Sequence, residues 1–165
     1  MQGPTNLCSG CIIIDVNMPG MDGPALQHEL HRRGTQLPMI FLSGYGTIPT
    51  TVSTIKAGAM DFLTKPVKGS VLLERVAEAI QLSRQIKDQS VEHRAAVSRL
   101  ASLTGREREI MDLAVTGLTS KEIAQKLSIS FRTVEIHRAH VMQKTGATNL
   151  LALARIALVA GSHRD

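Results

Sequence analysis

The sequence predicts an α/β domain followed by an all-α domain. In the N-terminal half, short apolar runs alternate with amphipathic segments, which is typical of a parallel sheet covered by helices on both faces. In the C-terminal half, three short amphipathic segments follow one another, and each begins with a hydroxyl residue suited to cap a helix. The excess positive charge also lies in this second half. The 165 residues therefore divide into two regions of different character.

Three apolar runs in the first region are expected to be strands, at residues 11–14, 39–42 and 61–64. Helices are expected over residues 24–33, 49–57 and 70–82, because their apolar side chains recur at helical spacing. Gly34 and Gly58 follow the first two of these segments and suit helix ends. The side chains expected to face the core are Leu26 and Leu30, then Val52 and Ile55, and then Leu72, Val76, Ala79 and Ile80.

Each expected strand ends in a polar residue, which is Asp15, Ser43 or Lys65. The carboxyl ends of parallel strands meet at one edge of an open α/β sheet, and ligands bind at that edge. A carboxylate can attack phosphorus to form an acyl phosphate. A hydroxyl and an ammonium can then bind the phosphoryl oxygens, and a divalent cation can offset the remaining charge. The three residues together indicate a site for phosphoryl transfer.

The second region begins after residues 83–99, a polar and charged segment that we interpret as a helical linker. The first domain then covers residues 1–82 and the second covers residues 100–165. The last expected helix, residues 149–160, is apolar nearly all round. A helix of this kind is buried on more than one side. We therefore expect one face on the domain core and another face on a partner subunit.

The middle of the second domain has the pattern of a helix-turn-helix. Thr104 and Thr119 each precede a Glu by three positions, which is the capping box of a helix start. Ser130 opens a third segment, and residues 127–130 alone separate it from the second. The pattern predicts two short helices joined by a tight turn, and the second helix is basic and polar on its open face. This arrangement is typical of DNA-binding proteins.

The distribution of charge favours a polyanionic partner for this domain. Residues 1–83 carry six basic and six acidic residues, whereas residues 84–165 carry thirteen basic and eight acidic ones. The Cys8–Cys11 pair precedes a strand rather than a helix and lacks further zinc ligands, so we interpret it as a chance spacing. With no signal peptide and no membrane-spanning apolar run, the chain is expected to be cytoplasmic.

Both regions resemble a known family. Asp15 with residues 18–23, 43–44 and 56–66 resembles the receiver domain of two-component response regulators. Residues 103–107, 117–118, 121–124 and 132–137 resemble the LuxR/FixJ (NarL) type of DNA-binding domain. The resemblance covers nearly the whole chain in the usual family order. It implies an incomplete flavodoxin-like receiver followed by a four-helix LuxR-type helix-turn-helix domain.

The resemblance also implies roles for individual receiver residues. Asp15 would accept the phosphoryl group and, with the backbone carbonyl of Asn17, would bind Mg²⁺. Lys65 would hold the phosphoryl group. Ser43 and Phe62 would form a switch pair, in which the aromatic ring follows the hydroxyl inward. The Lys65–Pro66 peptide bond is expected to be cis, a state that is accessible before proline.

One departure from the family concerns the expected Mg²⁺ site. The family carries an acidic pair at the end of its first strand, well before the acceptor, and these carboxylates hold Mg²⁺. In this sequence fourteen residues precede Asp15 and none of them is acidic. We therefore expect a receiver without its first strand, first helix and second strand. Either the sequence is a fragment or has a misassigned start, or the product has lost its Mg²⁺ site.

The helix that begins at Ser130 is expected to enter the major groove of DNA. The resemblance places contacts with base edges at Glu135, Ile136 and Ala139, where Glu135 suits a cytosine amino group and Ile136 suits a thymine methyl group. Phosphate contacts are expected at Lys121, Arg132, Thr133, His137, Arg138 and Lys144.

Two pairs of histidines are candidates for metal ligands, because the members of each pair stand three positions apart. His137 and His140 share a helix face, but we expect no metal site there because the sequence shows no carboxylate partner. The spacing of His28 and His31 around Glu29 does not fit the zinc-binding H-E-x-x-H motif.

The leading interpretation is a transcriptional regulator without enzymatic activity, in which phosphorylation of Asp15 controls dimerisation and promoter binding. Its expected partners are double-stranded promoter DNA, a sensor histidine kinase, a second copy of the chain and RNA polymerase, with no membrane. One alternative is a regulator that binds DNA independently of phosphorylation, since the acidic pair is absent. A distant alternative is a haloacid dehalogenase-like phosphatase, but that chemistry needs an Asp where this chain has Asn17. A pure protein-interaction module also stays open.

Overall fold

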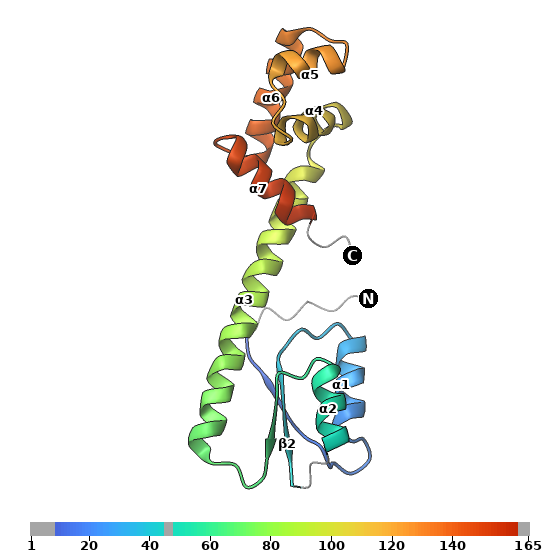
Figure 1. Ribbon diagram of the computed structural model, residues 1–165, viewed down its shortest axis with the longest axis vertical. Coiled ribbons are helices and arrows are strands. Elements are labelled where there is room, and N and C mark those ends of the chain that lie inside the picture. Colours follow the sequence, from blue (N-terminus) through green and yellow to red (C-terminus); the bar gives the residue numbers. More distant parts are fainter. Residues whose placement is uncertain (1–8, 45–47, 162–165) are drawn as a thin grey trace. The chain divides into compact units, whose positions relative to one another are not determined.

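The computed structural model describes residues 9–44 and 48–161, and the chain divides into two compact units between Gln89 and Ser90 (Figure 1). Residues up to Gln89 are the first unit, and residues from Ser90 onward are the second unit. Cys8 of the C-x-x-C pair lies outside the described residues. Among the described helices, none combines the length and the apolar character that crossing a membrane requires.

The first unit is built on a three-stranded parallel sheet. Its strands are β1 (Ile12–Asp15), β2 (Met39–Ser43) and β3 (Asp61–Thr64), in that order. β2 is central, because Phe41 pairs with Ile14 on one side and with Phe62 on the other. Ile14 and Phe41 are buried, as expected for apolar strands covered on both faces. The parallel sheet expected from the sequence is confirmed.

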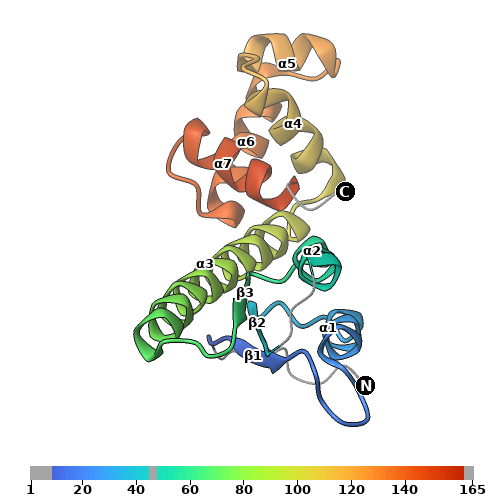
Figure 2. The same ribbon diagram turned by 60° about the horizontal axis from the view of Figure 1, so that its bottom comes forward.

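Three helices pack on this sheet, namely α1 (Gly23–Arg32), α2 (Ile48–Lys56) and α3 (Gly69–Ala101). Figure 2 shows α1 and α2 on one side of the strands and the first part of α3 on the other. α1 begins at Asp22, whose carboxylate accepts a hydrogen bond of 2.8 Å from the Ala25 N–H. Leu26 and Leu30 of α1 pack against the buried cluster around Phe41, as expected.

The expectation for the buried face of α2 was wrong. Val52 and Ile55 are 45% and 43% exposed, whereas Thr54 is buried. The Thr54 hydroxyl is satisfied locally, because it donates to the Thr50 carbonyl at 3.0 Å. The buried Gln27 side chain of α1 donates to the Thr54 carbonyl at 3.2 Å. A polar contact between α1 and α2 therefore replaces the apolar one that helical spacing predicted.

α3 spans 33 residues and runs through the predicted linker at residues 83–99, which is entirely helical. The sequence contains no Gly or Pro from Ser70 to Ala101, so nothing in it interrupts the helix. In the first unit Ala79 is fully buried, and the buried Ser83 hydroxyl accepts a hydrogen bond of 3.1 Å from the Gly10 N–H.

The second unit contains the end of α3 and four further helices. These are α4 (Gly105–Val115), α5 (Ser120–Lys126), α6 (Phe131–Thr145) and α7 (Leu150–Gly161). Both capping boxes are confirmed, at Thr104 and at Thr119. Ser130 caps α6 by accepting a hydrogen bond from the Thr133 N–H. Ser128, in the turn between α5 and α6, has a φ of +53°, so a non-glycine residue occupies a left-handed position there.

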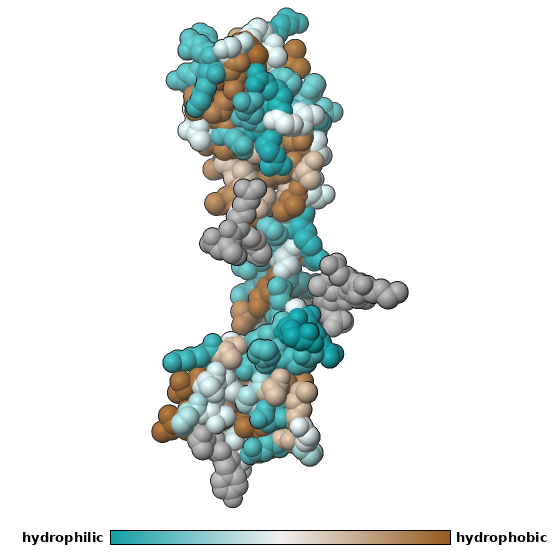
Figure 3. Space-filling model, turned by 90° about the vertical axis from the view of Figure 1, so that its right-hand side faces the viewer, coloured by the Kyte–Doolittle hydropathy of each residue, from teal (hydrophilic) through white to brown (hydrophobic). Residues whose placement is uncertain are grey.

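The core of the second unit joins α4, α5 and α6 through Ile110, Ile123 and Val134, none of which is exposed. A second cluster includes Met111 and Val141 and extends to Leu153 of α7. Two other large side chains of α7, Leu151 and Leu158, are 80% and 72% exposed. Figure 3 shows such apolar side chains at the surface among the polar ones.

Candidate functional site

The sheet brings Asp15, Ser43 and Lys65 to one edge. Asp15 ends β1 and pairs with Leu42, and Ser43 ends β2 and pairs with Thr64. Lys65 directly follows β3, and its N–H donates to the Ser43 carbonyl at 2.7 Å. The three residues lie at the carboxyl ends of neighbouring parallel strands, which is where open α/β sheets bind ligands.

Asp15 and Lys65 form an ion pair between Oδ2 and Nζ. The other carboxylate oxygen, Oδ1, accepts a hydrogen bond of 3.1 Å from the Asn17 N–H. The hydrogen bond from Lys65, followed by that from Asn17, lowers the pKa of Asp15, so this carboxyl group is ionised at neutral pH. The two side chains are 35% and 44% exposed, and a ligand can therefore reach them from solvent.

Of the expected switch pair, Ser43 stands at the same edge of the sheet as this ion pair, and Phe62 lies within β3. Ser43 is fully buried. Phe62, on the neighbouring strand, is half-buried and stacks on Phe41 with ring centroids 6.5 Å apart and an angle of 13° between the ring planes. The Lys65–Pro66 peptide bond is cis, which confirms that expectation.

In the second unit, α5, the turn at residues 127–130 and α6 form a helix-turn-helix. Val134 and Val141 turn toward the core, as expected. Six of the nine predicted DNA contacts are exposed on α5 and α6, and these are Lys121, Arg132, Glu135, Ile136, Ala139 and Lys144. Ile136 is 48% exposed, so its side chain is available for a contact with a thymine methyl group.

Four of the nine predicted DNA contacts interact within the protein or are partly covered. Thr133 bonds the hydroxyl of Ser130 at 2.8 Å, and Arg138 donates to the Ser120 hydroxyl at 2.7 Å. Lys144 donates to Glu107 of α4 at 2.7 Å. His137 is half-buried. Arg138 and Lys144 therefore link α6 to α5 and α4, whereas Thr133 bonds within the start of α6.

Residues 5–77 match the family described as response regulator receiver domain, and residues 101–157 match the bacterial regulatory proteins of the luxR family. The transcriptional regulatory protein TdiR of Thauera aromatica is 41% identical over 154 residues, covering 93% of this chain and 68% of that protein. FixJ of Azorhizobium caulinodans is 41% identical over 152 residues, with 92% and 72% covered. The solved structure of the response regulator StyR gives a TM-score of 0.77 at 37% identity, covering 92% of this chain and 76% of that one. The chain belongs to the LuxR/FixJ-type response regulators.

This response regulator therefore combines a flavodoxin-like receiver with a LuxR-type DNA-binding domain. Its relatives are transcriptional regulatory proteins of two-component systems, a class whose members are generally not enzymes. The interpretation of the chain as a two-component transcriptional regulator with a DNA-binding domain is thus confirmed.

Gly23 is a receiver residue whose role the sequence analysis missed. A Cβ atom at this position would lie 2.7 Å from the Asp15 carbonyl oxygen and 2.9 Å from a ring carbon of Phe41. The Gly23 N–H also donates to the Val16 carbonyl at 3.0 Å, which closes the loop after Asp15. The sequence signal was present, since a Gly between a helix cap and a proline suits a close backbone approach.

Receiver domains typically use Mg²⁺ for phosphorylation, and the ligands at Asp15 can be tested for fit. Asp15 offers one carboxylate, and its two oxygens already contact Lys65 and the Asn17 N–H. Among the described residues, the groups of three or more His, Cys, Asp or Glu side chains that could hold a metal do not include Asp15. Mg²⁺ keeps several waters among its six oxygen ligands and is usually held by one or two carboxylates, so Asp15 and the backbone carbonyl of Asn17 are the described groups that would hold the ion.

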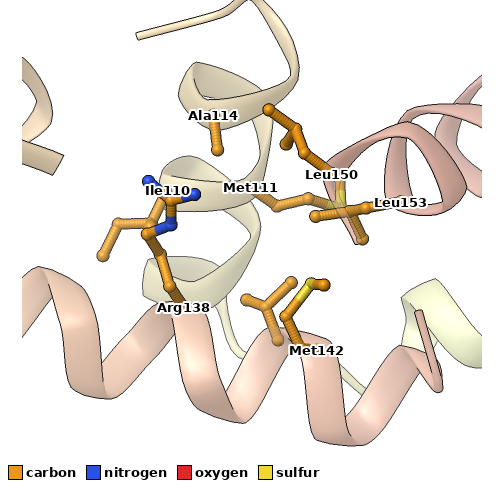
Figure 4. A pocket seen from close by; sticks show the side chains of 8 residues that line it. Ile110, Met111, Ala114, Arg138, Met142, Leu150 and Leu153 are labelled. Carbon is orange, nitrogen blue, oxygen red and sulfur yellow. The ribbon is translucent and has the colours of Figure 1, made fainter. Parts of the chain in front are cut away.

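A small cavity of about 70 Å³ lies between α4, α6 and α7 of the DNA-binding domain (Figure 4). Its lining is mostly aliphatic, and Arg138 extends from α6 toward Ile110 at its edge. Pockets for small ligands are several times larger, at about 300–1,000 Å³. We interpret this cavity as a packing gap that gives α7 room to adjust, rather than as a ligand site.

The expectation that His137 and His140 lack a carboxylate partner was wrong. Glu107, at the start of α4, places Oε1 3.7 Å from Nδ1 of His140. One ligand atom from each of Glu107, His137 and His140 lies within 4.8 Å of the others. The carboxylate comes from a different helix, thirty positions before His137, and spacing within one helix could not indicate it.

Proposed function

We propose that Asp15 is the phosphoryl acceptor of this response regulator. The observation that carries the proposal is the ion pair of Asp15 with Lys65 at the carboxyl edge of the sheet, beside Ser43. In the transfer step, a carboxylate oxygen forms a bond to phosphorus while the bond between phosphorus and the leaving atom of the donor breaks. The Lys65 ammonium then offsets the charge of the phosphoryl oxygens. No step in this description depends on a bound metal ion.

Ser43 and Phe62 transmit the phosphorylation of Asp15 to the surface of the receiver. The phosphoryl oxygens add acceptors at the end of β1, and the Ser43 hydroxyl on the neighbouring strand donates to one of them. Phe62 is half-buried, so rotation of its ring changes the surface that the receiver offers to other molecules. This coupling between charge and packing is the usual basis of phosphorylation switches.

α6 reads the major groove of promoter DNA. Glu135, Ile136 and Ala139 are exposed on it and contact base edges. Lys121, Arg132 and the exposed Lys144 contact phosphates, and Thr133, His137 and Arg138 support them from partly covered positions. The excess positive charge of residues 84–165 favours this interaction with a polyanion.

The regulator acts as a dimer on DNA and receives its phosphoryl group from a sensor histidine kinase. The exposed Leu151 and Leu158 of α7 support the dimer, because large apolar side chains at a surface indicate an interaction site. A two-fold dimer matches two half-sites in the promoter. RNA polymerase is a further partner that would follow from promoter binding.

The acceptor proposal is tested by labelling the chain with a radioactive small-molecule acyl phosphate. We expect label in the wild-type chain and in D61N, but not in D15N. Asp61 is the matched control, because it is a carboxylate of the same sheet that pairs with Arg75. Equal label in D15N and wild type, or no label in either, would refute Asp15 as the acceptor.

A second function is favoured by one observation, which is that both carboxylate oxygens of Asp15 are already engaged, one by Lys65 and the other by the Asn17 N–H. In that case the chain binds DNA independently of phosphorylation. Band-shift affinities measured with and without acyl phosphate separate the two functions. A change in affinity that D15N abolishes supports phosphorylation control, whereas equal affinities support the second function.

A further inference from the structure

Three potential metal ligands meet between α4 and α6 of the DNA-binding domain. Glu107 stands in the first turn of α4, and His137 and His140 stand three positions apart on α6, on one face of that helix. The ligand atoms of these three side chains lie within 4.8 Å of one another. In the part of the chain that the structure describes, this is the group of side chains spaced to hold a metal ion.

The carboxylate of this group is held in place by two hydrogen bonds to one of its oxygens. Oε2 accepts both the Lys144 ammonium and the Thr104 N–H, at 2.7 and 2.8 Å. Oε1 instead faces the His140 ring at 3.7 Å, so this oxygen keeps lone pairs directed toward the histidines.

The histidines differ in exposure, and both suit a ligand role. His140 is 53% exposed and can adjust its ring without disturbing the core. His137 is half-buried, and its Nδ1 is shielded from solvent with no hydrogen-bond partner among the described residues. A buried ring nitrogen without a partner is rare in proteins and calls for an explanation, for which a bound ion is one recognised cause.

We propose that Glu107, His137 and His140 form a binding site for a divalent transition metal ion such as Zn²⁺, which links α4 to α6. Two imidazoles and one carboxylate are a known zinc ligand set, with water in the fourth position. Tetrahedral zinc with these ligands requires ligand atoms about 3.4 Å apart. The ligand atoms lie within 4.8 Å of one another, so they need to close by up to about 1.4 Å, which the exposed His140 side chain can supply.

Lys144 competes with the metal for the same carboxylate. Its ammonium binds Oε2 of Glu107, and its side chain is 37% exposed, so it can turn toward solvent when a second cation approaches Oε1. Replacing the ammonium with a neutral polar group therefore strengthens metal binding. An increase in metal affinity on loss of Lys144 distinguishes a ligand role of Glu107 from a purely structural role. If Glu107 were only structural, the loss of Lys144 would not increase metal affinity.

The test measures Zn²⁺ binding to the full chain by isothermal titration calorimetry after treatment with a chelator. In H140Q and E107Q we expect the Zn²⁺ affinity of this site to fall about tenfold or more. The wild type should therefore bind one more equivalent of Zn²⁺ than either variant. Gln at position 107 can still cap α4, and His140 is exposed, so both variants keep the fold. K144Q is expected to bind Zn²⁺ more tightly than wild type.

The matched control is the double variant H28Q/H31Q. His28 and His31 are also three positions apart on one helix, but the neighbouring Glu29 is held by Arg32 and Arg33. This variant is expected to bind Zn²⁺ like the wild type. Equal binding by wild type and H140Q, or weaker binding by K144Q, would overturn the proposal. The measurement uses no DNA and no phosphodonor, so its outcome is independent of the function proposed above.

Discussion

The two units of the chain assemble their candidate sites in different ways. In the receiver, Asp15 and Lys65 are fifty positions apart in sequence and meet only because β1 and β3 flank the same central strand. In the DNA-binding domain, the exposed residues of α6 lie within two turns of one helix, next to the turn that precedes it. The receiver site therefore depends on the whole sheet, whereas the reading surface depends on local caps and on one helix–helix contact. Substitutions that disturb the packing of the sheet should therefore affect the receiver site. Substitutions in α6, in its caps or in its contact with α4 should affect the DNA-binding domain.

The largest effect is expected for the combined variant R132A/T133A/I136A on the reading surface. Its promoter affinity should fall by about two orders of magnitude, because it loses both phosphate and base contacts. Fluorescence anisotropy with labelled promoter DNA at fixed salt measures the change. R32A is the control, since it removes the same single charge from an exposed position of α1. Unchanged affinity of the triple variant would remove α6 as the reading helix.

G23A should lower the free energy of unfolding of its unit more than G105A, the matching change in the second unit, does. The added methyl group would meet the Asp15 carbonyl at 2.7 Å, and relieving this contact costs about 1–3 kcal/mol. Gly105 likewise begins a helix, but no atom lies within 4 Å of a Cβ built there, so G105A should be neutral or slightly stabilising. Urea denaturation monitored by circular dichroism compares the two. Equal stability of both variants would contradict the close approach at Gly23.

A smaller effect is expected for E107Q, and it depends on pH. Folding lowers the pKa of Glu107 from its ordinary value of 4.5 to about 2, so the ionised form stabilises the folded state. This contribution is complete above about pH 4.5 and is lost as the pH falls toward 2. E107Q should therefore lower the melting temperature by a few degrees at pH 7 and by less near pH 3.

E29Q is the matched comparison in the receiver, since the pKa of Glu29 is also lowered to about 2, by Arg32 and then Arg33. Those arginines are about 70% exposed, and surface ion pairs contribute little. Its melting temperature at pH 7 should thus change less than that of E107Q. The reverse order would show that the link between α4 and α6 is not important for stability.

The smallest effect is expected at the capping box of α5. T119A removes the hydroxyl that accepts the Glu122 N–H and should cost about 1 kcal/mol. T119S keeps the hydroxyl and should behave like wild type. Thermal denaturation of the two variants measures the difference. A similar loss in both variants would mean that the methyl group of Thr119, rather than its hydrogen bonds, stabilises this helix start.

Much of the second unit could be predicted from sequence, because its signals are local. Thr104, Thr119 and Ser130 each cap the helix that follows, as expected. The failures concern contacts between elements. Val52 and Ile55 were expected in the core and are exposed, because the polar contact of Gln27 with Thr54 holds that face instead. Periodicity identifies a helix, but it does not show which face a neighbouring element will cover.

By itself the sequence determined where the strands end, where the helices begin and which half of the chain carries the positive charge. These properties depend on neighbouring residues and on composition, and they are therefore written in short segments. Only the tertiary structure decided that Glu107 stands beside His140 and that Gly23 has no room for a side chain. Both facts arise where separate elements pack together, and packing depends on distances in space that no spacing along the chain encodes.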